Sequence, residues 1–127
     1  MSARRILVVD DEPDIREVAQ MSLETVPGWQ VLTAESGDEC ITKARQERPD
    51  AILLDAMMPD MDGATTFEKL QTDPSTKHIP VIMFTAKVQP ADRKKFTDLG
   101  VKGVITKPFD PMNLGSQIAA ILGWSVR

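Results

Sequence analysis

The sequence predicts a single α/β domain in which five parallel strands alternate with five helices. Its apolar runs are short and continuous rather than alternating, which is typical of strands covered on both faces. Segments with helical spacing fill the intervals between the runs, and strand–helix alternation implies parallel strands with helices on both sides of the sheet. The runs occupy residues 6–9, 29–32, 51–54, 81–84 and 101–105.

The first expected helix has clear signals at both ends. Pro13 suits a first helical turn that Asp11 or Glu12 can cap, and Pro27 and Gly28 stop the helix. Helical spacing predicts that one apolar face of this helix comprises Ile15, Val18, Ala19, Ser22 and Val26.

The second helix begins with the signature of a capping box, because Glu39 follows Ser36 by three residues, and Pro49 ends it. The third helix has a weaker signal, with Phe67 and Leu70 as its apolar residues, and the fourth, over residues 91–99, is mostly polar and ends at Gly100. The fifth helix has a clear apolar stripe, which comprises Leu114, Ile118, Ile121 and Leu122.

Composition limits the classes of function. The chain has 127 residues, 42% of them hydrophobic, so we expect one globular domain over residues 4–123 and a short tail over 124–127. A net charge of −4 disfavours direct nucleic-acid binding. The lone Cys40 and lone His78 exclude an internal disulfide and a multi-histidine metal site. The longest apolar stretches are far shorter than a membrane span, so we expect a cytoplasmic protein without membrane contact.

Polar residues cluster where the predicted strands end. In a parallel α/β sheet, ligands bind at the carboxyl ends of the strands, which share one edge. Carboxylates, a hydroxyl and an ammonium group should therefore converge there. The residues after the first, third, fourth and fifth runs include Asp10, Asp11, Glu12, Asp55, Thr85, Ala86, Thr106 and Lys107.

Gathered carboxylates repel one another and need compensating charge. Lys107 supplies one positive charge, and a hard divalent cation that prefers oxygen ligands, Mg²⁺ or alternatively Mn²⁺, would supply the rest. A cation and a lysine together form a clamp for a transferring phosphoryl group, which one carboxylate could accept. Taken singly, these residues have ordinary explanations: helix caps for Asp10, Asp11 and Thr85, a turn for Asp55 and a solvated end for Lys107. Their coincidence at one predicted edge favours a functional site.

From about Arg4 to Gly123 the sequence resembles the receiver domain of bacterial two-component response regulators. The resemblance implies a flavodoxin-like, doubly wound (βα)5 fold with strand order 2-1-3-4-5. The motifs that carry it are ILVVDDE at 6–12, LLD at 53–55, MPDMDG at 58–63, FTA at 84–86 and KPF at 107–109.

The resemblance also implies roles for individual residues. Asp55 corresponds to the phosphoryl acceptor. Asp11 corresponds to the main protein ligand of Mg²⁺, joined by Asp55 and the backbone carbonyl of Met57. Asp10 corresponds to a partner that reaches the ion mostly through water.

Three more residues match the phosphate-binding part of the family pattern. Lys107 corresponds to the group that pairs first with Asp55 and then with the phosphoryl oxygens, aimed by a cis peptide to Pro108. Thr85 corresponds to the switch hydroxyl, and Ala86 to the small residue that leaves room for it. The family commonly has an aromatic residue three positions before the lysine; Val104 stands there, so an aromatic swing cannot occur.

The implied partners are a sensor histidine kinase or a histidine phosphotransfer protein as donor. A downstream protein would bind the face of the fourth helix, fifth strand and fifth helix, and the chain would be a monomer or a phosphorylation-dependent dimer. The alternative is a receiver-like scaffold that recognises partners without phosphorylation. A turnover phosphohydrolase is disfavoured, because it needs an acid two residues after its nucleophile, and Met57 occupies that position.

Overall fold

The computed structural model describes residues 4–58, 61–86 and 89–124. Pro59 and Asp60 of the MPDMDG motif and residues 125–127 of the expected tail lie outside the described residues. Strands and helices alternate along the chain as expected. The elements are β1 (Arg5–Val9), α1 (Pro13–Thr25), β2 (Gln30–Ala34), α2 (Gly37–Glu47), β3 (Ala51–Asp55), α3 (Gly63–Thr72), β4 (Val81–Thr85), α4 (Pro90–Leu99), β5 (Gly103–Thr106) and α5 (Leu114–Leu122).

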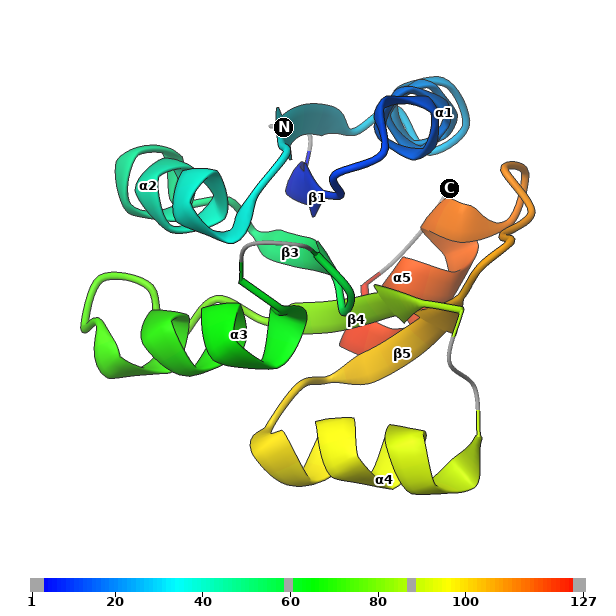
Figure 1. Ribbon diagram of the computed structural model, residues 1–127. Helices are drawn as coiled ribbons and strands as arrows, with labels where there is room; N and C mark the ends of the chain where they lie inside the picture. Colours follow the sequence, from blue (N-terminus) through cyan, green and yellow to red (C-terminus); the bar gives the residue numbers. More distant parts are fainter. Residues whose placement is uncertain (1–3, 59–60, 87–88, 125–127) are drawn as a thin grey trace.

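The strands form one parallel sheet with order β2-β1-β3-β4-β5, which confirms the expected flavodoxin-like topology. Helices α1 and α5 cover one face of the sheet, while α2, α3 and α4 lie on the other (Figure 1). Residue Leu54 of β3 pairs with Val9 of β1 and with Met83 of β4. The carboxyl ends of these strands therefore lie at one edge of the sheet, where a site can form.

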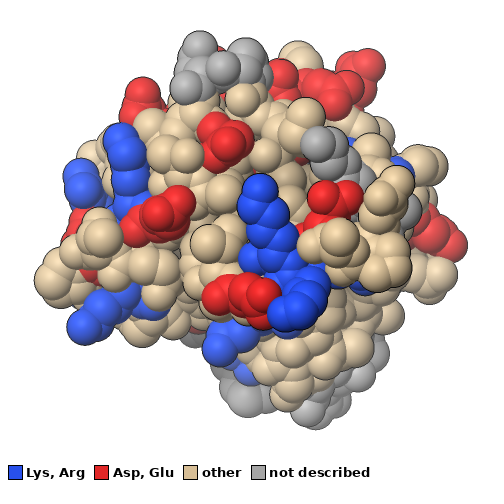
Figure 2. Space-filling model, turned by 60° about the horizontal axis from the view of Figure 1, so that its bottom comes forward, with Lys and Arg blue, Asp and Glu red and all other residues tan. Residues whose placement is uncertain are grey.

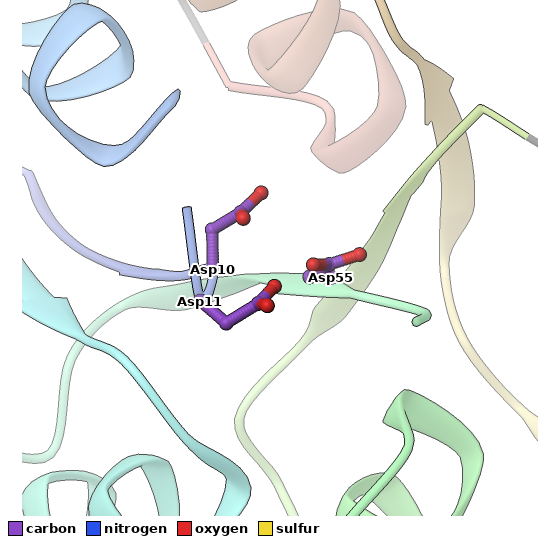
Figure 3. A group of neighbouring side chains, drawn as sticks. All are labelled: Asp10, Asp11 and Asp55. Carbon is purple, nitrogen blue, oxygen red and sulfur yellow. The ribbon is translucent and has the colours of Figure 1, made fainter. Parts of the chain in front are cut away.

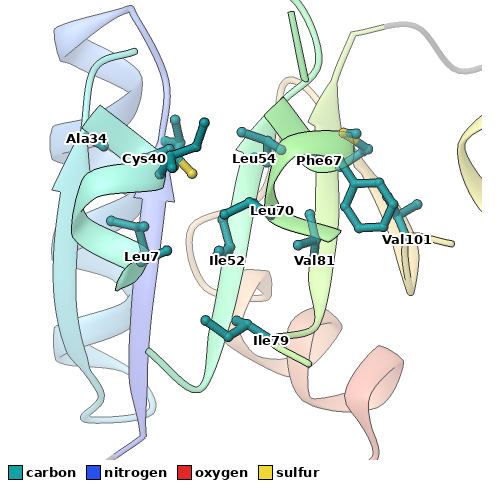
Figure 4. Close-up of a cluster of buried hydrophobic side chains, with 14 of the residues drawn as sticks. Leu7, Ala34, Cys40, Ile52, Leu54, Phe67, Leu70, Ile79, Val81 and Val101 are labelled. Carbon is teal, nitrogen blue, oxygen red and sulfur yellow. The ribbon is translucent and has the colours of Figure 1, made fainter. Parts of the chain in front are cut away.

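Both faces of the sheet are buried, which explains why the strands are continuously apolar. On one face Leu7, Ile52 and Leu54 pack beneath α2 and α3, which contribute Cys40 and Leu70 (Figure 4). The second core cluster, on the opposite face, combines strand residues with side chains of α1 and α5. Its strand members are Ile6, Val8, Val31, Ala51, Leu53, Ile82, Phe84 and Ile105. Because β3 contributes to both clusters, its end is held firmly between them.

The inward face of α1 differs from the prediction. Ala19, Ser22 and Leu23 are its buried residues, whereas Val18 and Val26 are 43% and 40% exposed. Val18 is turned about 100° from Ala19 around the helix. Val26 lies beyond the last helical residue as the C-cap, so it is not part of the buried stripe.

The capping predictions are partly confirmed. Glu12 is the N-cap residue of α1, but its side chain makes no capping hydrogen bond. Ser36 caps α2 by accepting from the Glu39 N–H, while the Glu39 carboxylate accepts from the N–H of Glu35 and not from that of Ser36.

The strand ends also differ slightly from the prediction. β2 begins at Gln30, one residue later than expected, and β5 begins at Gly103. Val101 is buried but precedes β5, because its N–H bonds to the carbonyl of Phe96 at the end of α4. A Cβ atom at Gly103 would lie 2.9 Å from Ile121, so the lack of a side chain permits close packing of α5 on this strand.

Candidate functional site

Three carboxylates meet at the carboxyl edge of the sheet. One ligand oxygen from each of Asp10, Asp11 and Asp55 lies within 4.8 Å of the others. Figure 3 shows the side chains converging from the end of β1 and the end of β3. Asp10 and Asp55 are buried, at 0% and 2% exposed, and Asp11 is accessible to solvent. The edge is therefore an acidic pocket with one open side.

Lys107 supplies the compensating charge. Its Nζ atom lies 2.6 Å from Asp10 Oδ2 and 3.4 Å from Asp55 Oδ1. The same ammonium lies 4.9 Å from the centre of the Phe84 ring, within the range of a cation–π contact. The backbone N–H of Lys107 donates to the carbonyl of Thr85, and its peptide bond to Pro108 is cis, as expected. The lysine side chain thus reaches both buried carboxylates.

Local backbone donors orient the two buried acids. The Glu12 N–H donates to Asp10 Oδ1 over 2.9 Å, and the Met57 N–H donates to Asp55 Oδ1 over 3.0 Å. Each contact spans two residues, as in an Asx turn. The turn after each strand therefore holds the carboxylate in place.

Burial dominates the acid–base behaviour of the acceptor candidate. It raises the pKa of Asp55 to about 7, while the Met57 N–H and the Lys107 charge act downward and the Asp10 charge acts upward. For Lys107, burial lowers the pKa, but the hydrogen bond to Asp10 and the charge of Asp55 outweigh it and raise the pKa overall. The lysine therefore stays protonated, and further positive charge that approaches Asp55 would favour its ionised form.

A cavity of about 280 Å³ opens above Asp55. Its lining contains the predicted phosphate-binding residues, with Thr85 buried at the end of β4 and Ala86 exposed beside it. The complete lining is Glu12, Asp55, Met57, Thr85, Ala86 and Lys107. The space accommodates a tetrahedral group bonded to the Asp55 carboxylate and within reach of Lys107.

The ordinary explanations fail for most of these residues. The N-cap of α1 is Glu12 rather than Asp10 or Asp11, and Thr85 is a strand residue while the N-cap of α4 is Gln89. For Asp55 the turn explanation holds in part, because this last residue of β3 also accepts from the Met57 N–H in the turn that follows. The structure therefore brings to one edge of the sheet the seven residues to which the resemblance gives roles, namely Asp10, Asp11, Asp55, Met57, Thr85, Ala86 and Lys107.

Sequence reasoning missed two residues that touch this site. Phe84 lies under the Lys107 ammonium, and Arg16 of α1 donates from Nη1 to the main-chain carbonyl of Asp10 over 2.7 Å. Neither contact has a sequence signal, because each joins a long or aromatic side chain to a site at a spacing that no helix or strand period specifies.

The donor set suits a hard divalent cation. All three side chains offer carboxylate oxygens, and two of them are buried beside one lysine, so negative charge remains in excess. Oxygen-only ligands without cysteine or histidine favour ions of the Mg²⁺ type. The residues present therefore fit the ion that the sequence analysis predicted.

The chain belongs to the response regulator receiver domain family, and it is a receiver domain of the two-component type. A model of that family matches residues 6–119, and the parallel order of the strands and the acidic edge agree with it. Phosphorylation-dependent signalling, rather than the scaffold alternative, is the class of function that this membership favours.

Two curated relatives illustrate the match. The chain is 39% identical over 119 residues to the alkaline phosphatase synthesis transcriptional regulatory protein PhoP of Bacillus subtilis. The matched region makes up 94% of this chain and 48% of PhoP. It is 40% identical over 120 residues to the phosphate regulon transcriptional regulatory protein PhoB of Escherichia coli. That match makes up 94% of this chain and 52% of PhoB. The chain thus spans about half the length of these relatives.

Solved structures support the fold. The chemotaxis protein CheY4 of Vibrio cholerae superposes with a TM-score of 0.88 at 29% identity, over 94% of this chain and 99% of CheY4. The N-terminal domain of a response regulator receiver protein from Methanoculleus marisnigri superposes with a TM-score of 0.78 at 39% identity. That match covers 98% of this chain and 100% of the other domain. Within the described ranges, every helix is too short or too polar to span a bilayer.

Proposed function

We propose that Asp55 accepts a phosphoryl group in a Mg²⁺-dependent reaction and that the resulting acyl phosphate switches the binding of a protein partner. The observation that carries this proposal is the placement of the buried Asp55 carboxylate at the floor of a cavity, 3.4 Å from Lys107 and next to two further acids. The chain acts as a signalling switch and not as a turnover enzyme.

The reaction needs an oxygen nucleophile, an open path for its attack on phosphorus, and positive groups that neutralise the negative charge of the phosphoryl oxygens. An Asp55 carboxylate oxygen forms a bond to phosphorus, and the bond from phosphorus to the donor nitrogen of a phosphohistidine breaks, leaving its electron pair on that nitrogen. Lys107 pairs with the phosphoryl oxygens as they leave the donor. Asp11, Asp55 and the Met57 carbonyl would hold a divalent cation directly and Asp10 mostly through water, and that cation would supply positive charge against the negative charge that develops on the phosphoryl oxygens.

After transfer, the new oxygens carry the signal. Thr85 lines the same cavity, so its hydroxyl can donate to a phosphoryl oxygen, and Ala86 leaves that path open. Movement of Thr85 at the end of β4 passes to β5, because Thr85 pairs with Thr106 in the sheet. Val104 of β5 is partly buried against the core and has no aromatic ring that could swing, so we place the switch in Thr85 and the backbone.

The phosphoryl donor is a histidine kinase or a phosphotransfer protein, which we place against α1 and the segment before α5. Three large apolar side chains there are exposed: Val18 at 43%, Met21 at 61% and Met112 at 67%. The Ser22 hydroxyl bonds to the carbonyl of Pro111, so α1 and that segment are adjacent. Exposed apolar side chains beside a reactive site favour a docking protein.

The downstream partner binds the face of α4, β5 and α5. Helix α4 has no fully buried residue among those described, and it carries Arg93, Lys94 and Lys95. Figure 2 turns this end of the molecule forward and shows Lys and Arg side chains there, interspersed with Asp and Glu side chains. A helix that is weakly packed can shift at low cost when Thr85 moves.

Three expectations remain predictions. The chain is a monomer or a phosphorylation-dependent dimer, its domain spans residues 4–123, and its location is cytoplasmic.

Acetyl phosphate with Mg²⁺ tests this function without a kinase. Intact-mass spectrometry should show a gain of about 80 Da, one phosphoryl group, which EDTA prevents. The Asp55→Asn protein should show no gain, and Asp98→Asn, a matched change on the exposed face of α4, should behave as the unchanged protein. Absence of any gain in the unchanged protein would support the scaffold alternative.

A further inference from the structure

Arg16 makes a contact that the proposed chemistry does not use. It lies in the first turn of α1, and its side chain is only 18% exposed. Nη1 donates to the main-chain carbonyl of Asp10 over 2.7 Å, whereas Nη2 lies 3.6 Å from the carboxylate of Glu35, which is 70% exposed. An ion pair with so exposed a partner contributes little, so the covered contact to Asp10 is the significant one.

Every other polar group of Asp10 has its own partner. Its N–H donates to the carbonyl of Ala34 on β2, and its carboxylate accepts from Glu12 N–H and pairs with Lys107. The carbonyl that Arg16 holds belongs to the peptide leading directly into Asp11. Rotation of this peptide would leave the Asp10 N–H and its contact with β2 in place, yet it would move the Asp11 carboxylate.

We propose that Arg16 is a positioning residue for the metal site, which it serves by fixing the peptide between Asp10 and Asp11 and so aiming Asp11 at the cation. The proposal rests on the proposed Mg²⁺-dependent function. Contacts that orient metal ligands from outside the coordination sphere commonly change metal affinity by about 10–100-fold when they are lost.

If Arg16 acted only through its charge, its removal would change Mg²⁺ affinity in the opposite direction. A guanidinium near the acidic cluster repels a divalent cation, so removing a positive charge that has no positioning role would tighten Mg²⁺ binding. Removing a positioning contact weakens binding despite that relief of repulsion. The sign of the change in Kd therefore separates the two roles.

The experiment is calorimetric titration of the full chain with MgCl₂, without any phosphoryl donor. We expect Arg16→Gln to raise the Kd for Mg²⁺ about tenfold, and Arg16→Lys, which keeps the charge but not the planar fork, to raise it about threefold. Glu35→Gln removes the exposed ion pair, and Arg45→Gln removes a distant pair with Asp73; both should stay within about twofold of the unchanged protein.

Folding is checked by urea unfolding in EDTA, and Arg16→Lys serves as the test variant if Arg16→Gln does not fold. A Kd that is unchanged or lowered in the folded Arg16 variants overturns the positioning role while leaving the proposed function intact. Failure of the unchanged protein to bind Mg²⁺ would overturn the proposed function as well.

Discussion

The buried Asp55 carboxylate should make the metal-free domain less stable as the pH rises. Its folded pKa of about 7 lies above the ordinary aspartate value of 3.8, mainly because burial disfavours the charge. Between those values the unfolded chain loses a proton that the folded chain keeps. Stability contributed by this group is therefore greatest in acid, falls between about pH 4 and pH 7, and is constant above.

The size of the effect follows from the same two values. One tenfold change in proton affinity corresponds to about 1.4 kcal/mol, so a pKa near 7 in place of 3.8 gives an upper limit of about 4 kcal/mol at pH 8. Asp55→Asn removes this cost and keeps the shape of the side chain, but it also weakens the pairing with Lys107. We therefore expect a net stabilisation of about 1–3 kcal/mol at pH 8 in EDTA, shrinking toward pH 5.

Urea unfolding from pH 5 to pH 8.5, followed by circular dichroism, measures this difference. Asp98→Asn is the control, because Asp98 is exposed and pairs with Lys94 on the surface, and it should change stability by less than about 0.5 kcal/mol at every pH. Saturating Mg²⁺ should raise the stability of the unchanged protein and reverse the order of the two proteins. If Asp55→Asn is destabilising in EDTA, or if its effect does not vary with pH, the account of Asp55 burial is wrong.

Three further predictions concern the lysine, the switch and the core. Lys107→Met should cost about 3 kcal/mol in urea unfolding at pH 8 in EDTA, because Asp10 is fully buried and loses its cation; an unchanged midpoint would refute the pairing. Thr85→Val should leave the mass gain from acetyl phosphate intact but abolish phosphorylation-dependent NMR shift changes in α4 and β5; retained changes would remove the switch role. Leu7→Ala should cost about 2–5 kcal/mol because the side chain is fully buried, while Met21→Ala, at 61% exposed, should change stability by less than about 0.5 kcal/mol, and equal effects would contradict the assigned core.

The elements that were easiest to predict are those whose side chains are buried on both faces. The runs at 51–54 and 81–84 became β3 and β4 with bounds one residue longer, because a continuous apolar run suits a central strand. β5 was harder, since it lies at the sheet edge and Val101 is buried without being part of the strand. Burial and strand pairing are different properties, and hydrophobicity reports only the first.

The candidate site was predictable where topology alone decides it. Residues that follow parallel strands must share an edge, so the convergence of Asp10, Asp55 and Lys107 could be inferred before any distance was known. The contacts of Arg16 and Phe84 could not, because they depend on how a side chain crosses a turn or lies beneath an ammonium group. The exposure of Val18 could not be predicted either, because an apolar stripe on a helix does not indicate which of its residues a neighbouring element covers.

Chemical trapping of the phosphorylated residue tests the central claim most directly. Borohydride reduces an aspartyl phosphate to homoserine, and peptide mass mapping then shows which carboxylate carried the phosphoryl group. After treatment with acetyl phosphate and Mg²⁺, the account predicts homoserine at position 55 and unmodified Asp10 and Asp11 in the same digest. Homoserine at position 10 or 11, or none at position 55, would contradict the assignment of Asp55 as the phosphoryl acceptor.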